Sequence, residues 1–159
     1  MGLLSFIFGK DVTRDWMANR GMRLEIDLGR LTLCSVAIDA QIELLAGLGP
    51  AENRRAARSG KLHYYSKGLQ IEVQDGLLNG FTVYWDEPGY RPWSGMSIYE
   101  GSPIPLDAGT TPEKLIELAG EPGEREDDEV GTSLEYFRDD DWCDIQFDID
   151  GHLKAIFFG

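Results

Sequence analysis

The chain has 159 residues, 42% hydrophobic and 27% charged, and its 15 Lys and Arg residues against 28 Asp and Glu residues give a formal net charge of -13. This length and mixture indicate one globular domain, or two small units around one core, and exclude disorder of the whole chain. The excess of carboxylates argues against binding to nucleic acid or to an anionic membrane and favours a basic protein partner, with solubility as the simpler interpretation.

The N-terminal sequence and the cysteine content both predict a cytoplasmic protein. Residues 1–21 predict a short amphipathic segment whose apolar side chains dock on the domain, namely Leu4, Phe6, Ile7 and Phe8. The apolar run is too short for a signal peptide, and no stretch approaches the roughly 20 apolar residues of a membrane span. Cys34 and Cys143 could form one bridge, but they make no disulfide framework, so we interpret both as buried thiols.

The remainder of the chain contains an internal repeat, seen first in residues 62–84 and 134–158. The paired positions are Leu62 with Leu134, Tyr64 with Tyr136, and Asp75-Gly76 with Asp150-Gly151. Asp-Gly is a hairpin-turn signal, because both residues tolerate positive φ. Each segment therefore predicts a meander of three antiparallel strands.

Before each meander the sequence predicts a short helix, preceded by two short strands. In residues 110–122, Thr111 is the cap, Pro112 fits the first helical position and Gly120 is the stop. In residues 38–50, Asp39 is the expected cap and either Gly47 or Gly49 is the expected stop. The apolar face of this helix is expected to comprise Ile42, Leu44 and Leu45. The expected strands are Leu24–Leu28 with Leu31–Val36, and Ser97–Tyr99 with Ile104–Leu106.

The sequence thus predicts an α+β fold made of two diverged strand-strand-helix-three-strand repeats, over residues 22–86 and 96–159. Residues 87–95, rich in Pro and Gly, form the expected linker. One copy is small for an independent core, so we expect one combined globular domain with a single, mostly antiparallel sheet and helices on one face. The alternation of Leu62 inside and His63 outside leaves the other face of the sheet open.

A capped helix ending in Gly-x-Pro, a Leu-x-Tyr strand and a strand ending in Asp-Gly resemble the SmpA/OmlA-type outer-membrane assembly lipoproteins. Two such copies resemble the tandem fold of the β-lactamase inhibitor protein. The resemblance lies in Thr111–Pro122, Leu134–Tyr136 and Asp150–Ile156, and in the degenerate copy Asp39–Pro50, Leu62–Tyr64 and Asp75–Phe81. It implies a fold that mainly binds proteins, and small acidic cytoplasmic proteins of this kind are similar to bacterial immunity proteins.

Aromatic and acidic residues are the candidates for partner binding. They are Trp85, Tyr90, Trp93, Tyr99, Asp139, Asp140, Asp141 and Trp142. Trp and Tyr dominate interface hot spots, and carboxylates steer a basic partner. We expect Tyr90 and Trp93 to be exposed. The alternatives are that the aromatic residues cover the seam between the repeats, and that residues 124–129 and 139–141 are solvated loops.

The sequence carries no catalytic, cofactor or metal-binding signature. His63 and His152 have no ligand spacing around them, and the cysteines have no local His. Asp148–Gly151 partly matches the calcium-loop pattern but lacks the Glu that ends such a loop. A hairpin turn accounts for the Asp-Gly pair in this segment. We therefore expect no catalytic residue, metal or cofactor.

The favoured function is a non-catalytic immunity or inhibitor protein that neutralises a toxin or enzyme. An enzyme with a site assembled from scattered residues and a structural component of a larger assembly remain alternatives.

Overall fold

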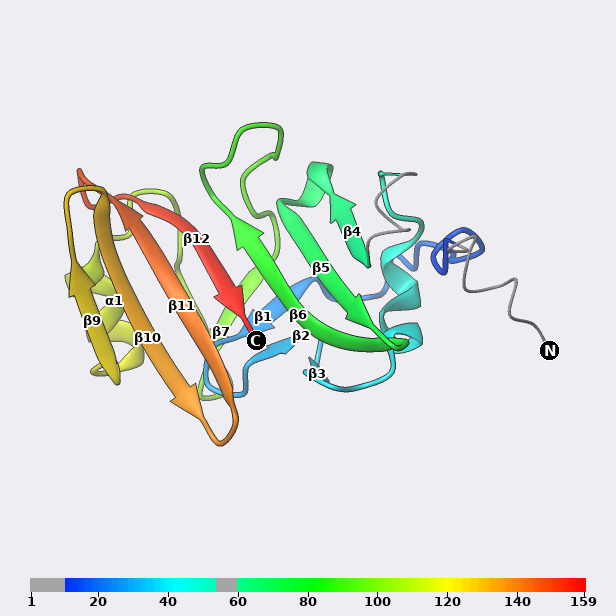
Figure 1. The fold of residues 1–159 in the computed structure, drawn as a ribbon, viewed down its shortest axis with the longest axis horizontal. Helices are drawn as coiled ribbons and strands as arrows, with labels where there is room; N and C mark the ends of the chain where they lie inside the picture. The colour runs from blue at the N-terminus through cyan, green and yellow to red at the C-terminus, as the bar shows by residue number, and fades with distance from the viewer. Residues whose placement is uncertain (1–10, 54–59) are drawn as a thin grey trace.

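The computed structural model describes residues 11–53 and 60–159, and it is mostly β, with two sheets and short helices (Figure 1). The helical elements are α1 (Pro112–Ala119), the 3-10 helix η1 (Ile42–Leu48) and the short 3-10 turn η3 (Tyr65–Lys67). No helix in this described part is long and apolar enough to span a bilayer. The apolar side chains predicted to dock from residues 1–10 lie outside the described residues, and residues 11–20 form a turn and irregular backbone instead of a helix.

A seven-stranded antiparallel sheet forms the front layer in Figure 1. In spatial order its strands are β4 (Lys61–Tyr64), β5 (Leu69–Gln74), β6 (Leu77–Tyr84), β12 (Leu153–Phe158), β11 (Asp141–Asp148), β10 (Gly131–Arg138) and β9 (Glu124–Asp127). Both predicted meanders are present, and they join where β6 pairs with β12. One alternative from the sequence is that residues 124–129, which include β9, are a solvated loop. β9 is instead an edge strand, because its backbone pairs with β10 along its whole length.

The second sheet has five short strands, and it corrects the expectation of a single sheet. Its order is β3 (Val36–Ala37), β2 (Thr32–Leu33), β1 (Glu25–Asp27), β7 (Met96–Tyr99) and β8 (Ser102–Ile104). β1 and β7 run parallel, with Ile26 opposite Ser97. These strands pair with one another instead of extending the meanders, because this arrangement buries Ile26 and Leu33 fully in the core.

One hydrophobic core lies between the two sheets and the helices. Its fully buried side chains come from both layers and include Ile26, Leu33, Ile42, Leu45, Leu62, Tyr64, Ile71, Leu115, Leu134, Ile145 and Ile156. In Figure 1, α1 and the five-stranded sheet lie behind the seven-stranded sheet. The core therefore covers one face of the seven-stranded sheet, while the alternating residues, such as His63 between Leu62 and Tyr64, point to the other face.

The two helices follow their sequence signals to different degrees. Thr111 Oγ1 accepts a hydrogen bond from the Lys114 N–H at 3.2 Å, and Gly120 ends α1 with a φ of 81°, as predicted. η1 departs from the prediction: Gln41 precedes it without a side-chain cap, and Leu44 is 62% exposed instead of buried. The start of η1 lies against the β5–β6 turn, because the N–H of Ile42, its first residue, donates to the carbonyl of Gly76 in place of a side-chain cap.

The two Asp-Gly pairs lie in corresponding hairpin connections, between β5 and β6 and between β11 and β12. Asp75 and Gly76 have φ values of 53° and 80°, and Gly151 has a φ of 80°. The first is a two-residue turn, since Gln74 pairs with Leu77. The second is longer, because Phe147 pairs with Leu153.

Replacing Gly151 by Val is expected to lower the free energy of unfolding by about 1 kcal/mol or more, because a β-branched residue resists positive φ. A Cβ at this position would meet nothing closer than Pro112 Cδ at 3.9 Å, so the loss reports on backbone conformation and not on crowding. Chemical denaturation measures it, with Ile149→Val in the same exposed turn as the control. Equal stability of the two variants would contradict the prediction.

Candidate functional site

The uncovered face of the seven-stranded sheet carries a row of outward side chains that crosses every strand. From β9 to β4, the cross-strand register places in this row Glu124, Glu135, Asp144, Phe157, Thr82, Gln70 and His63. From β10 to β4, each member lies between inward-facing neighbours along its strand, as Asp144 lies between the fully buried Cys143 and Ile145. The row therefore lies on the face opposite the core.

One half of this face is acidic, and we define the acidic half as Glu124, Glu126, Glu135 and Asp144. Glu135 lies directly opposite Glu124 on one side and Asp144 on the other. Like charges directly opposite one another destabilise a sheet. Among the described residues, none of these four carboxylates forms an ion pair with Lys or Arg.

The electrostatics of the acidic half reflect this crowding. Desolvation, followed by repulsion from Glu124, Asp144 and Glu126, raises the pKa of Glu135 above its ordinary value. Asp144 accepts hydrogen bonds from the Ser133 hydroxyl and from Gln146 Nε2, the latter at 2.8 Å. Neutral dipoles, and not cations, therefore solvate this carboxylate.

A hollow of about 280 Å³ lies over the acidic half. Its lining includes Glu126, Ser133, Glu135, Asp144, Gln146 and Lys154. Lys154 is the one cationic side chain among the lining residues that the structure describes. The hollow is therefore a surface depression with a strongly negative lining.

The other half of the face is aromatic, and we define the aromatic half as His63, Tyr65, Tyr84, Tyr90 and Phe157. Ring centroids lie 4.5 Å apart for Tyr84 and Tyr90, 4.9 Å for Tyr65 and Tyr90, 5.3 Å for His63 and Tyr65, and 6.5 Å for Tyr84 and Phe157. His63 Nδ1 shares a hydrogen bond with the Tyr90 hydroxyl. Partial burial, followed by the charge of Lys61, lowers the pKa of His63, so the imidazole is neutral at pH 7. The half is thus a connected, uncharged group of rings.

Two of the predicted partner-binding residues lie in the core. Trp85 is 6% exposed and Trp93 is 7% exposed. The expectation that Trp93 is exposed is wrong, because hydrogen bonds hold its segment against the meander. The Trp93 N–H donates to the Tyr84 carbonyl at 2.6 Å, and the Arg91 N–H donates to the Tyr65 carbonyl at 2.9 Å. Tyr90, from the same segment, is half-buried within the aromatic half.

The other predicted residues are distributed over several places. Tyr99 is half-buried on β7 in the five-stranded sheet. Asp139 and Asp140 are exposed in the β10–β11 turn, while Asp141 is partly covered. Trp142 is 39% exposed on the uncovered face. The eight candidates therefore do not form one composite surface. Of these eight, the strand register places Trp142 on the uncovered face, and the ring contacts place Tyr90 there.

Sequence reasoning missed several residues of this face, chiefly Glu135, Asp144, Phe137 and Phe157. Phe137 is 56% exposed and lies directly opposite Trp142. The alternation within β10 and β11 marks all but Phe157 as outward-facing. Which of them meet depends on the pairing register, and the short turn that pairs Arg138 with Asp141 fixes that register for β10 and β11.

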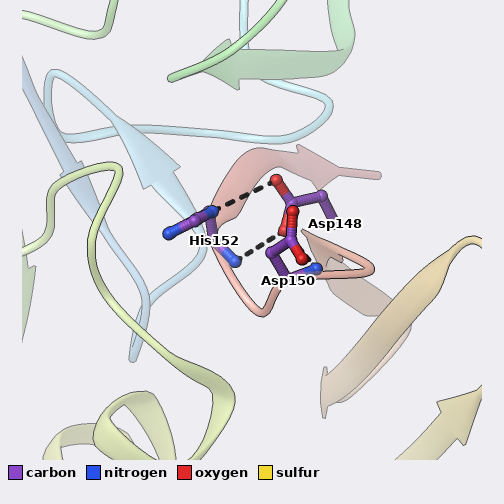
Figure 2. Close-up of side chains that lie close together, drawn as sticks. All are labelled: Asp148, Asp150 and His152. Carbon is purple, nitrogen blue, oxygen red and sulfur yellow. Dashed lines mark hydrogen bonds and ion pairs between the residues drawn. The ribbon is translucent and has the colours of Figure 1, made fainter.

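The β11–β12 turn brings together Asp148, Asp150 and His152, whose ligand atoms lie within 4.8 Å of one another. Figure 2 shows His152 joined by dashed lines to Asp148, with Asp150 beside Asp148. One Asp148 oxygen accepts from the backbone N–H groups of Asp150 and His152 at 2.9 and 2.8 Å, and the other lies 3.4 Å from His152 Nδ1. These bonds, first that from the His152 N–H, lower the pKa of Asp148. Two carboxylates and an imidazole suit a divalent transition metal, but the bonds shown also account for the turn on their own.

The cysteines are not placed for nucleophilic chemistry. Both thiols are free. Cys143 is fully buried, as expected, whereas Cys34 is half-buried. Desolvation raises the pKa of Cys143 to about 12 and also raises the pKa of Cys34. Both side chains are therefore protonated thiols at neutral pH, and the thiolate is the nucleophilic form.

Comparison with protein-family models, with curated proteins and with solved structures gave no match.

Proposed function

We propose that this chain is a non-catalytic protein-binding module that binds its partner on the uncovered face of the seven-stranded sheet. The observation that carries the proposal is the contrast between the two faces of the sheet. One face covers the core, and the other carries the acidic half beside the aromatic half, in which Tyr84 is buried and the other side chains are half-buried. Aromatic rings supply large contact area with few rotatable bonds, and carboxylates add specificity and association rate. A continuous sheet holds both halves in fixed register.

Within this proposal, the chain is an acidic immunity or inhibitor protein that neutralises a toxin or enzyme with a basic surface. Its net charge of -13 would accelerate encounter with such a partner. The free, protonated thiols are compatible with a reducing cytoplasm, where we place the protein. Inhibition by occupation of a partner's active surface needs no catalytic group of the chain's own.

We also propose that the fold consists of two diverged repeats, of the kind found in the tandem β-lactamase inhibitor protein and in SmpA/OmlA-type domains. The support is a symmetric register where β6 meets β12. Thr82 and Phe157 lie equally far after Asp75-Gly76 and Asp150-Gly151, and these equivalent residues pair directly with one another. A duplicated meander joined to its own copy would give this symmetry.

The test is binding of the purified partner to variants of the two faces. The full chain, immobilised, is used to isolate a partner from its source cell, and the affinity of the purified pair is then measured by calorimetry. Phe137→Ala on the uncovered face is expected to weaken binding about tenfold, the scale of a moderate hot spot. Leu44→Ala, an equally exposed apolar truncation on η1, is the matched control and is expected to bind like wild type.

Two results would overturn the proposal. One is a partner whose affinity depends on Leu44 and not on Phe137, together with unchanged binding by Tyr65→Ala in the aromatic half. The other is turnover of a small-molecule substrate by the chain itself, which would favour the enzyme alternative.

A further inference from the structure

We propose, resting on the proposed function, that the uncovered face selects a partner segment that carries arginine side chains, which bind across the acidic half and stack on the adjoining aromatic half. The occupant is thus a basic protein segment. The proposal depends on the position of charges and rings in the outward row and not on net charge alone.

Among the residues that the structure describes, no cation forms an ion pair with a carboxylate of the acidic half, although Lys154 lines the same hollow. Glu124, Glu135 and Asp144 face one another across three neighbouring strands, with the raised pKa of Glu135 as one sign of their repulsion. The nearby cation Arg125 lies on the opposite side of β9, where it pairs with Asp127 at 2.8 Å. Cations from a partner would replace this repulsion with attraction, so the face is complementary to a basic segment.

The spacing of these carboxylates favours side chains over a metal ion. Residues directly opposite one another on neighbouring strands have Cβ atoms about 5 Å apart, so Glu124 and Asp144 are separated by roughly 10 Å at that level. A single Ca²⁺ ion binds its oxygens at roughly 2.3–2.6 Å and draws them together. Guanidinium groups on a flexible segment can instead bridge carboxylates spread over three strands.

The neighbouring ring favours arginine over lysine. Phe157 lies directly opposite Asp144, so an aromatic face adjoins the end of the acidic row. A planar guanidinium can donate two hydrogen bonds to a carboxylate while it stacks on a ring, whereas an ammonium is a strongly hydrated point charge. The Ser133 and Gln146 side chains already hold Asp144 in place for such a contact.

The proposal can be tested with defined probes on the intact protein. Tetra-arginine amide, tetra-lysine amide and the uncharged tetra-citrulline amide are titrated into the labelled chain and followed by NMR. Tetra-arginine is expected to shift the amides of Glu124, Glu135 and Asp144 and the ring signals of Phe157. Tetra-lysine should bind more weakly, and tetra-citrulline should cause no shift.

A charge-matched pair of variants separates the acidic row from overall charge. Glu124→Gln with Glu135→Gln is expected to weaken tetra-arginine binding about fivefold or more, within the range for two exposed ion pairs. The control is Glu43→Gln with Glu117→Gln, two exposed positions on η1 and α1 that change the net charge equally. The control should retain the affinity of the wild type at the same ionic strength.

The affinity should also depend on pH with a defined sign. Protonation of Glu135 removes a charge that the arginine binds, so affinity falls as the pH falls through the raised pKa of this group. Among the described residues, the other charged groups near it are Glu124 and Glu126 from β9 and Asp144 from β11, together with Asp128 and Lys154, which line the same hollow. Glu124→Gln with Glu135→Gln should flatten this dependence.

Three outcomes would overturn the proposal: equal losses in both pairs of variants, shifts centred on Asp139–Asp141 or on the β11–β12 turn, or displacement of tetra-arginine by stoichiometric Ca²⁺. The probes need no natural partner, so their failure leaves protein binding by the uncovered face standing. Conversely, a partner whose affinity depends on Leu44 and not on Phe137 or Tyr65 would reject the proposed function even if tetra-arginine binds as expected.

Discussion

Replacing Trp93 by Ala is expected to lower the free energy of unfolding by about 3 kcal/mol or more, the cost of removing a large aromatic side chain from a core. Trp93 is 7% exposed and belongs to the same core as the buried residues of both sheets. Gly95 lies against its ring, where a Cβ would come within 2.2 Å of Cζ2. Chemical denaturation with an unchanged m-value would measure the loss.

Trp93→Phe is the matched control for this variant. The indole Nε1 of Trp93 has no hydrogen-bond partner among the described residues, so phenylalanine removes volume without breaking a hydrogen bond. We expect a loss of about 1 kcal/mol, within the range for volume-changing core substitutions. If Trp93→Ala instead retained full stability and bound the partner poorly, the sequence-based hypothesis of an exposed binding residue would be restored.

The position of Trp93 illustrates what the sequence could not reveal about residues 87–95. Proline and glycine in this segment correctly predicted an irregular connection. The segment is nevertheless tied to the meander by backbone hydrogen bonds to Tyr65 and Tyr84, residues that no local pattern connects with it. Composition predicts irregular backbone, whereas burial depends on contacts between distant residues.

Local signals predicted the meanders and α1 well. Thr111 and Gly120 act through bonds and backbone angles within a few residues of themselves, and the Asp-Gly turns do the same. The five-stranded sheet escaped prediction because its central pair joins Ile26 to Ser97, far apart in the sequence. Strands of two to four residues carry too little pattern to indicate such a parallel pairing.

The candidate site, too, was predictable from local sequence only in part. Alternation along β10 and β11 predicts that Glu135 and Asp144 share a face, but only the pairing of β6 with β12 brings the tyrosines and His63 next to Phe157 and the acidic half. No local pattern predicts that these two strands, one from each meander, become neighbours. The sequence therefore indicated an acidic, aromatic binding protein but not the surface that combines the two properties.

Replacing Gly68 by Ala is expected to lower the free energy of unfolding by about 2 kcal/mol or more, from left-handed backbone strain together with overpacking. Gly68 has φ 67° and ψ 37° after the η3 turn. A Cβ there would lie 2.5 Å from the Arg91 carbonyl oxygen and 2.7 Å from the Trp93 nitrogen. Both atoms belong to the backbone, so the whole segment would have to move.

Gly89→Ala is the control that separates strain from crowding. Gly89 has a φ of 89°, yet a Cβ there would meet nothing within 4 Å. Gly89→Ala should therefore lower the free energy of unfolding by about 1–2 kcal/mol, the strain alone.

Gly68→Ala should in addition shift Tyr90 away from Tyr65, because the N–H of Arg91 donates a hydrogen bond to the Tyr65 carbonyl. At a temperature where both variants are folded, Gly68→Ala should bind the partner more weakly than Gly89→Ala. Equal stability and equal affinity of the two variants would show that the close backbone approach at Gly68 does not position the aromatic half.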